Sequence, residues 1–465
     1  MWLPDRGPLP RRPDPGDGGI RQRAGRLLAR IRSPQDGEIL RLAVPALGAL
    51  VAEPLFLLAD SAIVGRIGTV PLGGLGVASQ ALSTLVGVSI FLAYGTTAAV
   101  ARQLGAGNHQ AAIRQGIDGL WLAAVIGAVV LAAGWPLAPA IVGAFGGSAA
   151  VTAQAAIYLR ISLLGAPSML AVLAGTGVLR GLQDTRTPLA VAVVANVVNI
   201  VLNATFVLGL HWGIAGSAWG TAIAQTGAAL AYLAMVGRGA RRAGVSFAPD
   251  LPGVRAAAFA GGSLVLRTLA LQAVLVIVTA IAARQGNAAI AANQVAFRIW
   301  NLLTLALDAI AIAGQAITGR HLGGGDVAAA RAATNRMIAW GAAYGVVFGL
   351  ALLAVRPFLP GLFDVTPAVA RLLLAVLLVA AVQQPVSGVV FVLDGVLIGA
   401  GDQDYLALAG LIALAVFGVV VAVLVPGHGL VALWAAFTVW MLARLVTLTL
   451  RARSSRWLVT GAVRG

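Results

Sequence analysis

Two carboxylates, Glu53 and Asp60, stand out in the apolar stretch EPLFLLADSAIVGRIG at residues 53–68. Their spacing places both on one face of a helix, about 10.5 Å apart along its axis. A carboxylate inside a bilayer is costly, and it is tolerated where it faces a cavity, pairs with a partner or takes up a proton. The chemistry predicted for Asp60 is therefore reversible proton binding, with a purely structural hydrogen bond as the alternative. For Glu53, a cavity role and a structural role are equally open.

Amides in a later apolar stretch are natural partners for such a carboxylate. Asn196, Asn199 and Asn203 are spaced so that they form one stripe along a helix. A buried amide without a hydrogen-bond partner costs about 1–3 kcal/mol, so these amides need polar neighbours. We expect a cation-coupling site made of Asp60, Asn199 and Asn203, with Asn196 and Thr221 as further cavity candidates. Polar packing between helices is the alternative interpretation.

The second half of the chain carries a different polar stripe. Gln294, Asn301, Asp308 and Gln315 recur at a heptad spacing, so in a helix they roughly share a face. We expect this face to line a cavity, where Asp308 meets a cationic substrate or pairs with an arginine.

Long apolar segments must position these residues. The chain has 465 residues, of which 59% are hydrophobic, and its mean hydropathy is +0.92. A membrane-spanning helix needs about 20 apolar residues, whereas a membrane β-barrel would show alternation instead. The sequence therefore predicts an all-α membrane protein. Its predicted transmembrane helices lie at residues 38–66, 72–104, 113–134, 150–182, 187–210, 213–237, 256–284, 289–319, 328–355, 367–399, 404–426 and 429–451.

A polar, basic segment, RGARRAGVSFAPDLPGVR at residues 238–255, divides these spans into two sets of six. The predicted organisation follows from it. We expect a disordered basic tail, an N-terminal lobe, a cytoplasmic linker, a C-terminal lobe and a second basic tail, at residues 1–35, 36–238, 239–255, 256–452 and 453–465 respectively.

The net charge of +16 is explained by membrane topology. Arginines gather in both tails and in the loops after every second span, which predicts cytoplasmic termini in the cytoplasmic membrane. No segment is large enough for a nucleic-acid-binding domain, so no nucleic-acid partner is expected. The chain has no cysteine, and its four histidines show no metal-binding spacing. We expect a monomer without metal or cofactor, apart from H⁺ or Na⁺ as a coupling ion.

An internal repeat relates the two halves. GVLRGLQD at 177–184 matches GVLIGAGD at 395–402, and ARQLGAGN at 101–108 matches GRHLGGGD at 319–326. Both matches have one shift, because 395 − 177 = 218 and 319 − 101 = 218. With six spans per copy the repeat is parallel, which predicts two similar lobes that face each other and rock between two states.

The repeat also places the ion site in the first lobe. At a shift of 218, the polar residues of the first half fall on apolar ones in the second. Glu53, Asp60, Asn199 and Asn203 correspond to Leu271, Val278, Phe417 and Val421. Because the same fold is expected to stand without these polar groups, packing alone does not require them.

Several segments together resemble the MATE (multidrug and toxic compound extrusion) transporters. They are LADSAIVGRIGTVPLGGLGVAS (58–79), ARQLGAGN, GVLRGLQDTRTP (177–188) and NVVNIVLN (196–203). The resemblance covers residues 38–450 and looks closest to the DinF branch. It implies twelve helices in two lobes and the export of organic, often cationic or amphipathic, compounds in exchange for H⁺ or Na⁺.

The resemblance also assigns residues. It implies that Asp60 is the coupling residue, matching a first-helix aspartate of the family. In some relatives an aspartate stands at the position of Asn203. The asparagine here weakens a Na⁺ site with two carboxylates and favours coupling through H⁺ at Asp60.

Two other classes of function compete with an exporter. A flippase for lipid-linked precursors should have an arginine-lined cavity, and an intramembrane enzyme should show paired histidines, a Ser–Lys pair or metal-ligand spacing. The sequence shows no paired histidines, Ser–Lys pair or metal-ligand spacing, so an enzyme is not expected. Asp394 is a further candidate residue, for which a solvated or capping role is favoured. Only four arginines are cavity candidates: Arg160, Arg267, Arg298 and Arg371. Of these, Arg267 or Arg298 could also pair with Asp308.

Overall fold

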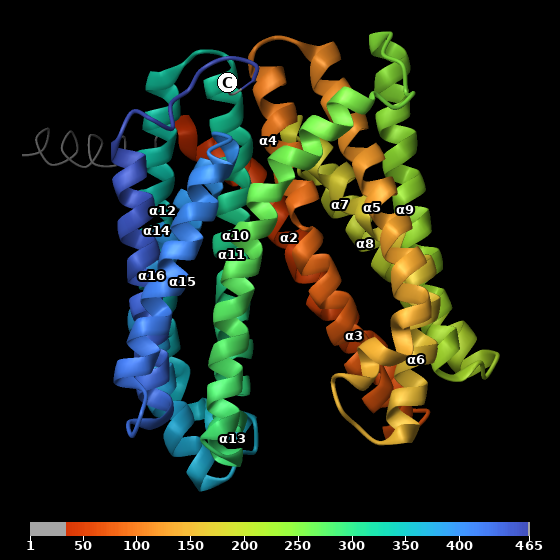
Figure 1. Cartoon of the computed structure of the whole chain (residues 1–465), viewed down its shortest axis with the longest axis vertical. Coiled ribbons are helices and arrows are strands. Elements are labelled where there is room, and N and C mark those ends of the chain that lie inside the picture. The colour runs from red at the N-terminus through yellow and green to blue at the C-terminus, as the bar shows by residue number, and fades with distance from the viewer. Residues whose placement is uncertain (1–33, 464–465) are drawn as a thin grey trace, which may run out of the picture.

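The computed structural model describes residues 34–463, which form two helical lobes (Figure 1). Within these residues, eleven helices or helix combinations are long and apolar enough to cross a membrane, and one bent pair supplies the twelfth. The predicted all-α membrane protein with two six-helix lobes is confirmed. Helix α2 begins at Pro34, and the rest of the tail predicted at residues 1–35 lies outside the described part of the chain.

The N-terminal lobe contains the helices that carry Asp60 and the asparagine stripe. Its elements are α2 (Pro34–Gly65), α3 (Thr69–Ser89), α4 (Phe91–Gly105), α5 (His109–Gly143), α6 (Ala149–Leu164), α7 (Ala166–Gly181), α8 (Arg186–Asn203), the π-helical turn η1 (Ala204–Gly209) and α9 (Gly213–Ala243).

The C-terminal lobe repeats this arrangement. Its elements are α10 (Leu251–Arg284), α11 (Asn287–Gly323), α12 (Val327–Val355), the 3₁₀ turn η2 (Arg356–Phe358), α13 (Leu359–Leu362), α14 (Pro367–Gly399), α15 (Gln403–Leu424) and α16 (Gly429–Arg453).

Two predicted spans of the N-terminal lobe are interrupted. The span predicted at 72–104 divides into α3 and α4 at Ile90, and the span predicted at 150–182 bends by 54° between α6 and α7. Pro167 lies in the first turn of α7, where its missing N–H group is tolerated. A Cβ atom on Gly127 would lie 2.5 Å from the Cα of Pro167, so α5 packs closely against the bend.

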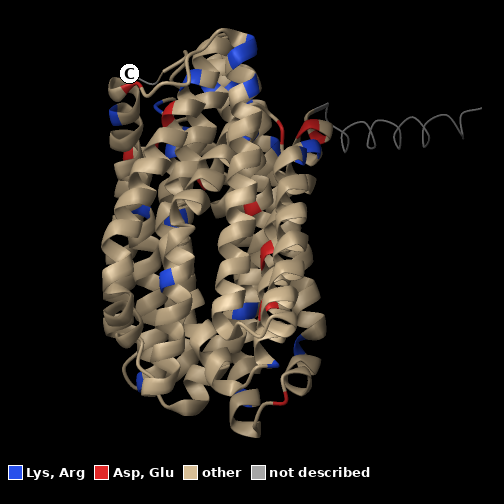
Figure 2. Cartoon of the chain, turned by 90° about the vertical axis from the view of Figure 1, so that its right-hand side faces the viewer, with Lys and Arg blue, Asp and Glu red and all other residues tan. Residues whose placement is uncertain are grey.

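The lobes converge at one end and diverge at the other (Figure 1). We call the converging end, where the C-terminus lies, the closed end, and the other the open end. Figure 2 shows basic side chains gathered around the loops of the closed end, whereas most of the helix length carries no charge.

The short connection between the lobes, residues 244–250, is fastened to α5. Gln110, Arg114 and Trp121 donate hydrogen bonds of 2.9, 3.1 and 2.9 Å to backbone carbonyls within residues 243–247. The connection is shorter than the predicted linker because α9 continues to Ala243.

Glycines explain why the repeated motif GVLxGxxD appears in both lobes. A Cβ atom on Gly177 would lie 2.6 Å from the carbonyl oxygen of Ala93, and one on Gly395 would lie 2.3 Å from that of Ala311. Both pairs are related by 218 residues, since 177 + 218 = 395 and 93 + 218 = 311. The motif therefore allows α7 to contact α4, and α14 to contact α11, backbone to backbone.

The closed end is built from the second repeated motif. A Cβ atom on Gly105 would lie 1.9 Å from the carbonyl oxygen of Arg320, and one on Gly323 would lie 2.0 Å from that of Arg102. The contact is reciprocal, as expected for two copies that meet at a pseudo-twofold axis. Larger residues at either glycine would hold the ends of α4 and α11 apart.

Side chains add further bonds between the lobes at this end. Gln183, at the end of α7, donates a 2.9 Å hydrogen bond to the carbonyl of Ala316 in α11. The backbone φ of Gln183 is 65°, and Gly401, the matching residue of the second lobe, has a φ of 70°. Two ion pairs also join α2 to the other lobe: Asp36 with Arg336 at 2.6 Å, and Glu38 with Arg320 at 2.5 Å.

Candidate functional site

Asp60 is buried inside the N-terminal lobe, with 1% of its surface exposed. Its Oδ1 atom accepts hydrogen bonds from Asn203 Nδ2 at 2.7 Å and from Ser217 Oγ at 2.6 Å. The hydroxyl of Tyr158 lies 3.5 Å from Oδ2, at the outer limit of a hydrogen bond. The predicted pairing of Asp60 with Asn203 is thus present, and α2, α6, α8 and α9 all contribute to the site.

Asn203 occupies a special position in the backbone. Helix α8 ends at this residue and continues as the π-helical turn η1. A Cβ atom on Gly220 of α9 would lie 2.0 Å from Asn203 Oδ1, so the glycine makes room for the amide. π-Helical turns are frequent at functional sites because they redirect side chains within a helix.

Asn199 and Thr221 form a second layer next to Asp60 and its partners. Asn199 Nδ2 donates to Thr221 Oγ1 at 3.1 Å, and both residues are buried. Asn199 Oδ1 and Asn203 Oδ1 are buried and have no hydrogen-bond partner among the residues that the structure describes. These two amide oxygens are therefore available to a bound proton donor, water molecule or cation.

Two residues of the site, Ser217 and Tyr158, escaped the sequence analysis. Ser217 lies one helical turn before Thr221 on α9, and this i, i+4 spacing was a usable signal. Tyr158 lies on α6, one turn before the buried Ser162. Like the other site residues, both correspond to apolar residues in the second half of the repeat. Ser217 corresponds to Ala435 and Tyr158 to Val376 (217 + 218 = 435; 158 + 218 = 376).

Asn196 and Glu53 are not part of this cluster. Asn196 Nδ2 donates to the carbonyl of Ala52 at 3.0 Å and so ties α8 to α2. Glu53 is exposed, and no hydrogen bond or ion pair involves it within residues 34–463. Asp60 and Glu53 therefore have different surroundings although they lie on the same helix.

The predicted stripe of the C-terminal lobe lies along α11 and changes in exposure. Gln294 and Asn301 are exposed, Asp308 is half-buried, and Gln315 is buried with 2% exposure. Gln315 lies near the closed end, where Gly399 packs against its backbone. Exposure thus falls along the stripe from the open end toward the closed end.

The C-terminal lobe also holds a buried ion cluster. Asp394 is 7% exposed and forms ion pairs with Arg267 and Arg444, while Arg444 lies 5.0 Å from the ring centre of Trp440. The solvated or capping role favoured for Asp394 was wrong. Asp308 interacts electrostatically with Arg267, Arg444 and Arg180, the last of which belongs to the other lobe.

The ion cluster is specific to its lobe. Arg267, Asp394 and Arg444 correspond to Ala49, Thr176 and Thr226 in the first lobe (267 − 218 = 49; 394 − 218 = 176; 444 − 218 = 226). The Asp60 site and this ion cluster are therefore each replaced by apolar or small uncharged side chains at the matching positions of the other lobe. The remaining arginine candidates do not join either centre: Arg298 and Arg371 are exposed, and Arg160 lies 5.3 Å from the ring of Trp135.

The arrangement around Asp60 suits a group that changes its charge. Its partners are hydroxyls and an amide, and no Arg or His forms an ion pair with it in the described part of the chain. Hydroxyl groups can donate to a carboxylate or accept from a carboxylic acid by rotating. Among the described residues, no three His, Asp or Glu side chains gather as metal ligands.

Comparison with known proteins agrees with this architecture. The MatE family model matches residues 45–205 and 264–424, one match in each lobe. The chain is 32% identical over 429 residues to the DNA damage-inducible protein F of Escherichia coli (strain K12), covering 89% of this chain and 91% of that protein. It is 30% identical over 453 residues to the chloroplastic Protein DETOXIFICATION 44 of Arabidopsis thaliana, covering 94% of this chain and 82% of that protein.

Solved structures share the fold at lower sequence identity. A multidrug resistance MATE family transporter of the MOP superfamily, in its outward-facing conformation, superimposes with a TM-score of 0.83 at 20% identity. The match covers 91% of this chain and 96% of that one. With both lobes matched by the family model and a relative more than 30% identical over most of its length, this chain belongs to the MatE family of membrane transporters.

Proposed function

We propose that this protein exports organic compounds, cationic or amphipathic in character, from the cell in exchange for H⁺. The observation that carries the proposal is the carboxyl of Asp60, buried within the membrane-spanning part and surrounded by Asn203, Ser217 and Tyr158. The outward-facing relative of similar fold is described as a multidrug resistance transporter, which supports export.

The exchange follows from alternating access. The basic loops of the closed end favour a cytoplasmic location for this end and for both chain termini, within the cytoplasmic membrane. With the closed end in the cytoplasm, the diverging lobes offer their inner faces to the outside. Protonation of Asp60 from outside would remove a buried charge and favour release of substrate, and loss of the proton inside would restore the binding form.

Na⁺ is the alternative coupling ion. The oxygens of Asp60, Asn199 and Asn203 are of the kind that bind hard cations, but only one of the three residues is a carboxylate. A neutral amide at position 203 lowers the affinity for a cation more than it affects proton uptake by Asp60. We therefore favour H⁺, with a monomer as the functional unit and no cofactor.

The test is efflux of ethidium from proteoliposomes, driven by an imposed pH gradient. The wild type should transport, and Asp60→Asn should lower the rate about tenfold or more, as expected when a hydrogen-bonded charge is lost. Asp364→Asn is the matched control, because Asp364 is exposed in a loop and asparagine tolerates its φ of 46°. Equal transport by Asp60→Asn and wild type would contradict coupling at Asp60.

Two further measurements separate the alternatives. If transport needs a Na⁺ gradient and does not depend on the pH gradient, the coupling ion is Na⁺ and not H⁺. Translocation of a lipid-linked precursor, combined with no export of small cations, would favour the flippase instead.

A further inference from the structure

The chain continues beyond the last membrane helix and lies across the closed end. Residues 454–463, here called the strap, follow α16. Trp457 anchors the strap in the C-terminal lobe: it is 1% exposed, and its indole N–H donates to the carbonyl of Ala452 at 2.9 Å. Leu458 packs beside it against the same hydrophobic core.

Past this anchor the strap binds both lobes through its backbone. Arg102, on α4 of the N-terminal lobe, donates to the carbonyl of Val459 at 2.7 Å and to that of Ala400 at 2.9 Å. The backbone N–H of Gly461 donates to the carbonyl of Leu322, on α11 of the C-terminal lobe, at 3.0 Å. One guanidinium group thus joins the strap, α4 and the end of α14.

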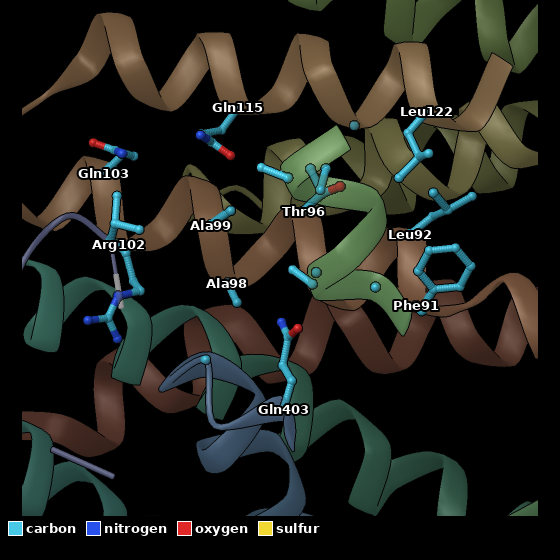
Figure 3. A pocket seen from close by; sticks show the side chains of 18 of the residues that line it. Phe91, Leu92, Thr96, Ala98, Ala99, Arg102, Gln103, Gln115, Leu122 and Gln403 are labelled. Carbon is cyan, nitrogen blue, oxygen red and sulfur yellow. The ribbon is translucent and has the colours of Figure 1, made fainter. Parts of the chain in front are cut away.

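The end of the strap also completes the wall of an inter-lobe cavity of about 350 Å³. Phe91, Thr96 and Gln115 line it from the N-terminal lobe, Gln403 from the C-terminal lobe, and Ala462 and Val463 from the strap. Figure 3 shows Gln115 and Gln403 reaching into it from opposite sides. Its walls belong to three parts of the chain, so the cavity exists only while those parts stay together.

Opening of the closed end must separate these partners. The backbone contacts of Gly105 with Arg320 and of Gly323 with Arg102 leave no gap between α4 and α11, so opening must part these two helix ends. Arg102 moves with α4, whereas Trp457 and Gly461 are bound to the C-terminal lobe. The bond from Arg102 to Val459 therefore breaks or stretches whenever the lobes part at this end.

We propose that the strap is an intramolecular latch that holds the closed end shut and releases α4 when that end opens. Contacts made in only one of two states stabilise that state by their free energy, so the latch shifts the population toward the closed form. The proposal rests on the alternating access of the proposed function, but it concerns the chain's own C-terminal segment.

The test measures the distance between two spin labels and needs neither substrate nor coupling ion. The chain has no cysteine, so His109→Cys and Ala328→Cys introduce the only labels. Both positions are exposed near the closed end, one in each lobe. A chain that ends at Leu458 keeps the Trp457 anchor. It loses the inter-lobe bond from Arg102 to Val459 and the bond from Gly461 to Leu322, which holds the strap on the C-terminal lobe. We expect the population of long distances to rise about tenfold, as for the loss of one hydrogen bond from a charged group.

Two full-length variants control the result. Gly461→Pro removes the N–H group that binds Leu322 and cannot adopt the φ of 104°, so it should produce the same shift without truncation. Arg464→Ala removes only the charge that the truncation also removes, and it should leave the distances unchanged. The latch is refuted if the shortened chain and Gly461→Pro both keep the wild-type distances, or if Arg464→Ala alone reproduces the shift. Absence of substrate efflux would refute the proposed function and leave this measurement intact.

Discussion

Gly105 and Gly323 each face the other lobe's backbone at the closed end, and the two contacts are copies of each other. The distances that a Cβ atom would have to the opposing carbonyl oxygens are 1.9 and 2.0 Å. Because both positions belong to one repeated motif, the same sequence feature closes the protein from both sides of its pseudo-twofold axis.

Gly323→Ala should therefore force α4 and α11 apart. The atoms that the new Cβ would meet belong to the backbone of Arg102, so a rotamer change cannot relieve the clash. We expect a loss of about 1–3 kcal/mol of stability, typical of overpacking. Thermal unfolding in detergent measures it. Gly237→Ala, in α9 with no atom within 4 Å of the added Cβ, should be neutral or stabilising. Equal effects of the two substitutions would show that the contact is not tight.

Ser217→Ala should impair proton-driven efflux more than Tyr158→Phe. The serine hydroxyl is 2.6 Å from Asp60, whereas the tyrosine hydroxyl is 3.5 Å away. A hydrogen bond to a charged group contributes about 1.5–3 kcal/mol, so we expect a loss of about tenfold or more for Ser217→Ala and less than about threefold for Tyr158→Phe. Initial efflux rates at several pH values provide the comparison, and the reverse order would contradict the geometry.

Asn203→Asp should make transport sensitive to Na⁺. The new carboxylate would lie within hydrogen-bonding distance of Asp60, because the Asn203 amide is 2.7 Å from it. Two adjacent carboxylates share a proton or bind a cation. The measurement compares the efflux rate in NaCl with the efflux rate in choline chloride. The wild type serves as the control. A variant that ignores Na⁺ at all pH values would argue that the site cannot hold the ion.

Asp394→Asn should destabilise the C-terminal lobe strongly. Arg267 and Arg444 would remain buried without the ion-pair partner that both share, and breaking such a buried pair costs about 3–5 kcal/mol. Adding Arg267→Met should recover part of the loss, because it removes one uncompensated charge. Asp326→Asn, at an exposed helix N-terminus, is the control, since asparagine caps helices as well as aspartate. A double variant less stable than the single one would contradict the charge argument.

Much of the fold was predictable because it depends on repeated local patterns. Long apolar segments and the 218-residue shift are properties of the sequence, and the described residues reproduce both. The bend between α6 and α7 was not predicted, although Pro167 within the predicted span was a local signal for it. The left-handed backbone of Gln183 belongs to a local C-terminal helix motif, in which the N–H groups of Gln183 and Asp184 bond to Arg180 and Leu179. The side-chain bond of Gln183 to Ala316, 133 residues away, was not predictable from the sequence.

The candidate site was predictable where helical spacing pointed to it. Asp60 and Asn203 were found because polar residues are rare in their helices. Asp394 was misinterpreted because its two arginine partners are 127 and 50 residues away. No periodicity within α14 reports a partner on α10 or α16, so only packing reveals this ion cluster.

The connection at residues 244–250 has a kinetic meaning beyond its length. It is fastened to α5 at one end and leads directly into α10 at the other, so the separated lobes cannot diffuse away from each other. Reassociation at the closed end is therefore a unimolecular event at a high effective concentration. In the alternating access proposed above, each glycine contact, ion pair and strap bond can then be weak enough to break in every cycle and still re-form before the lobes lose their register.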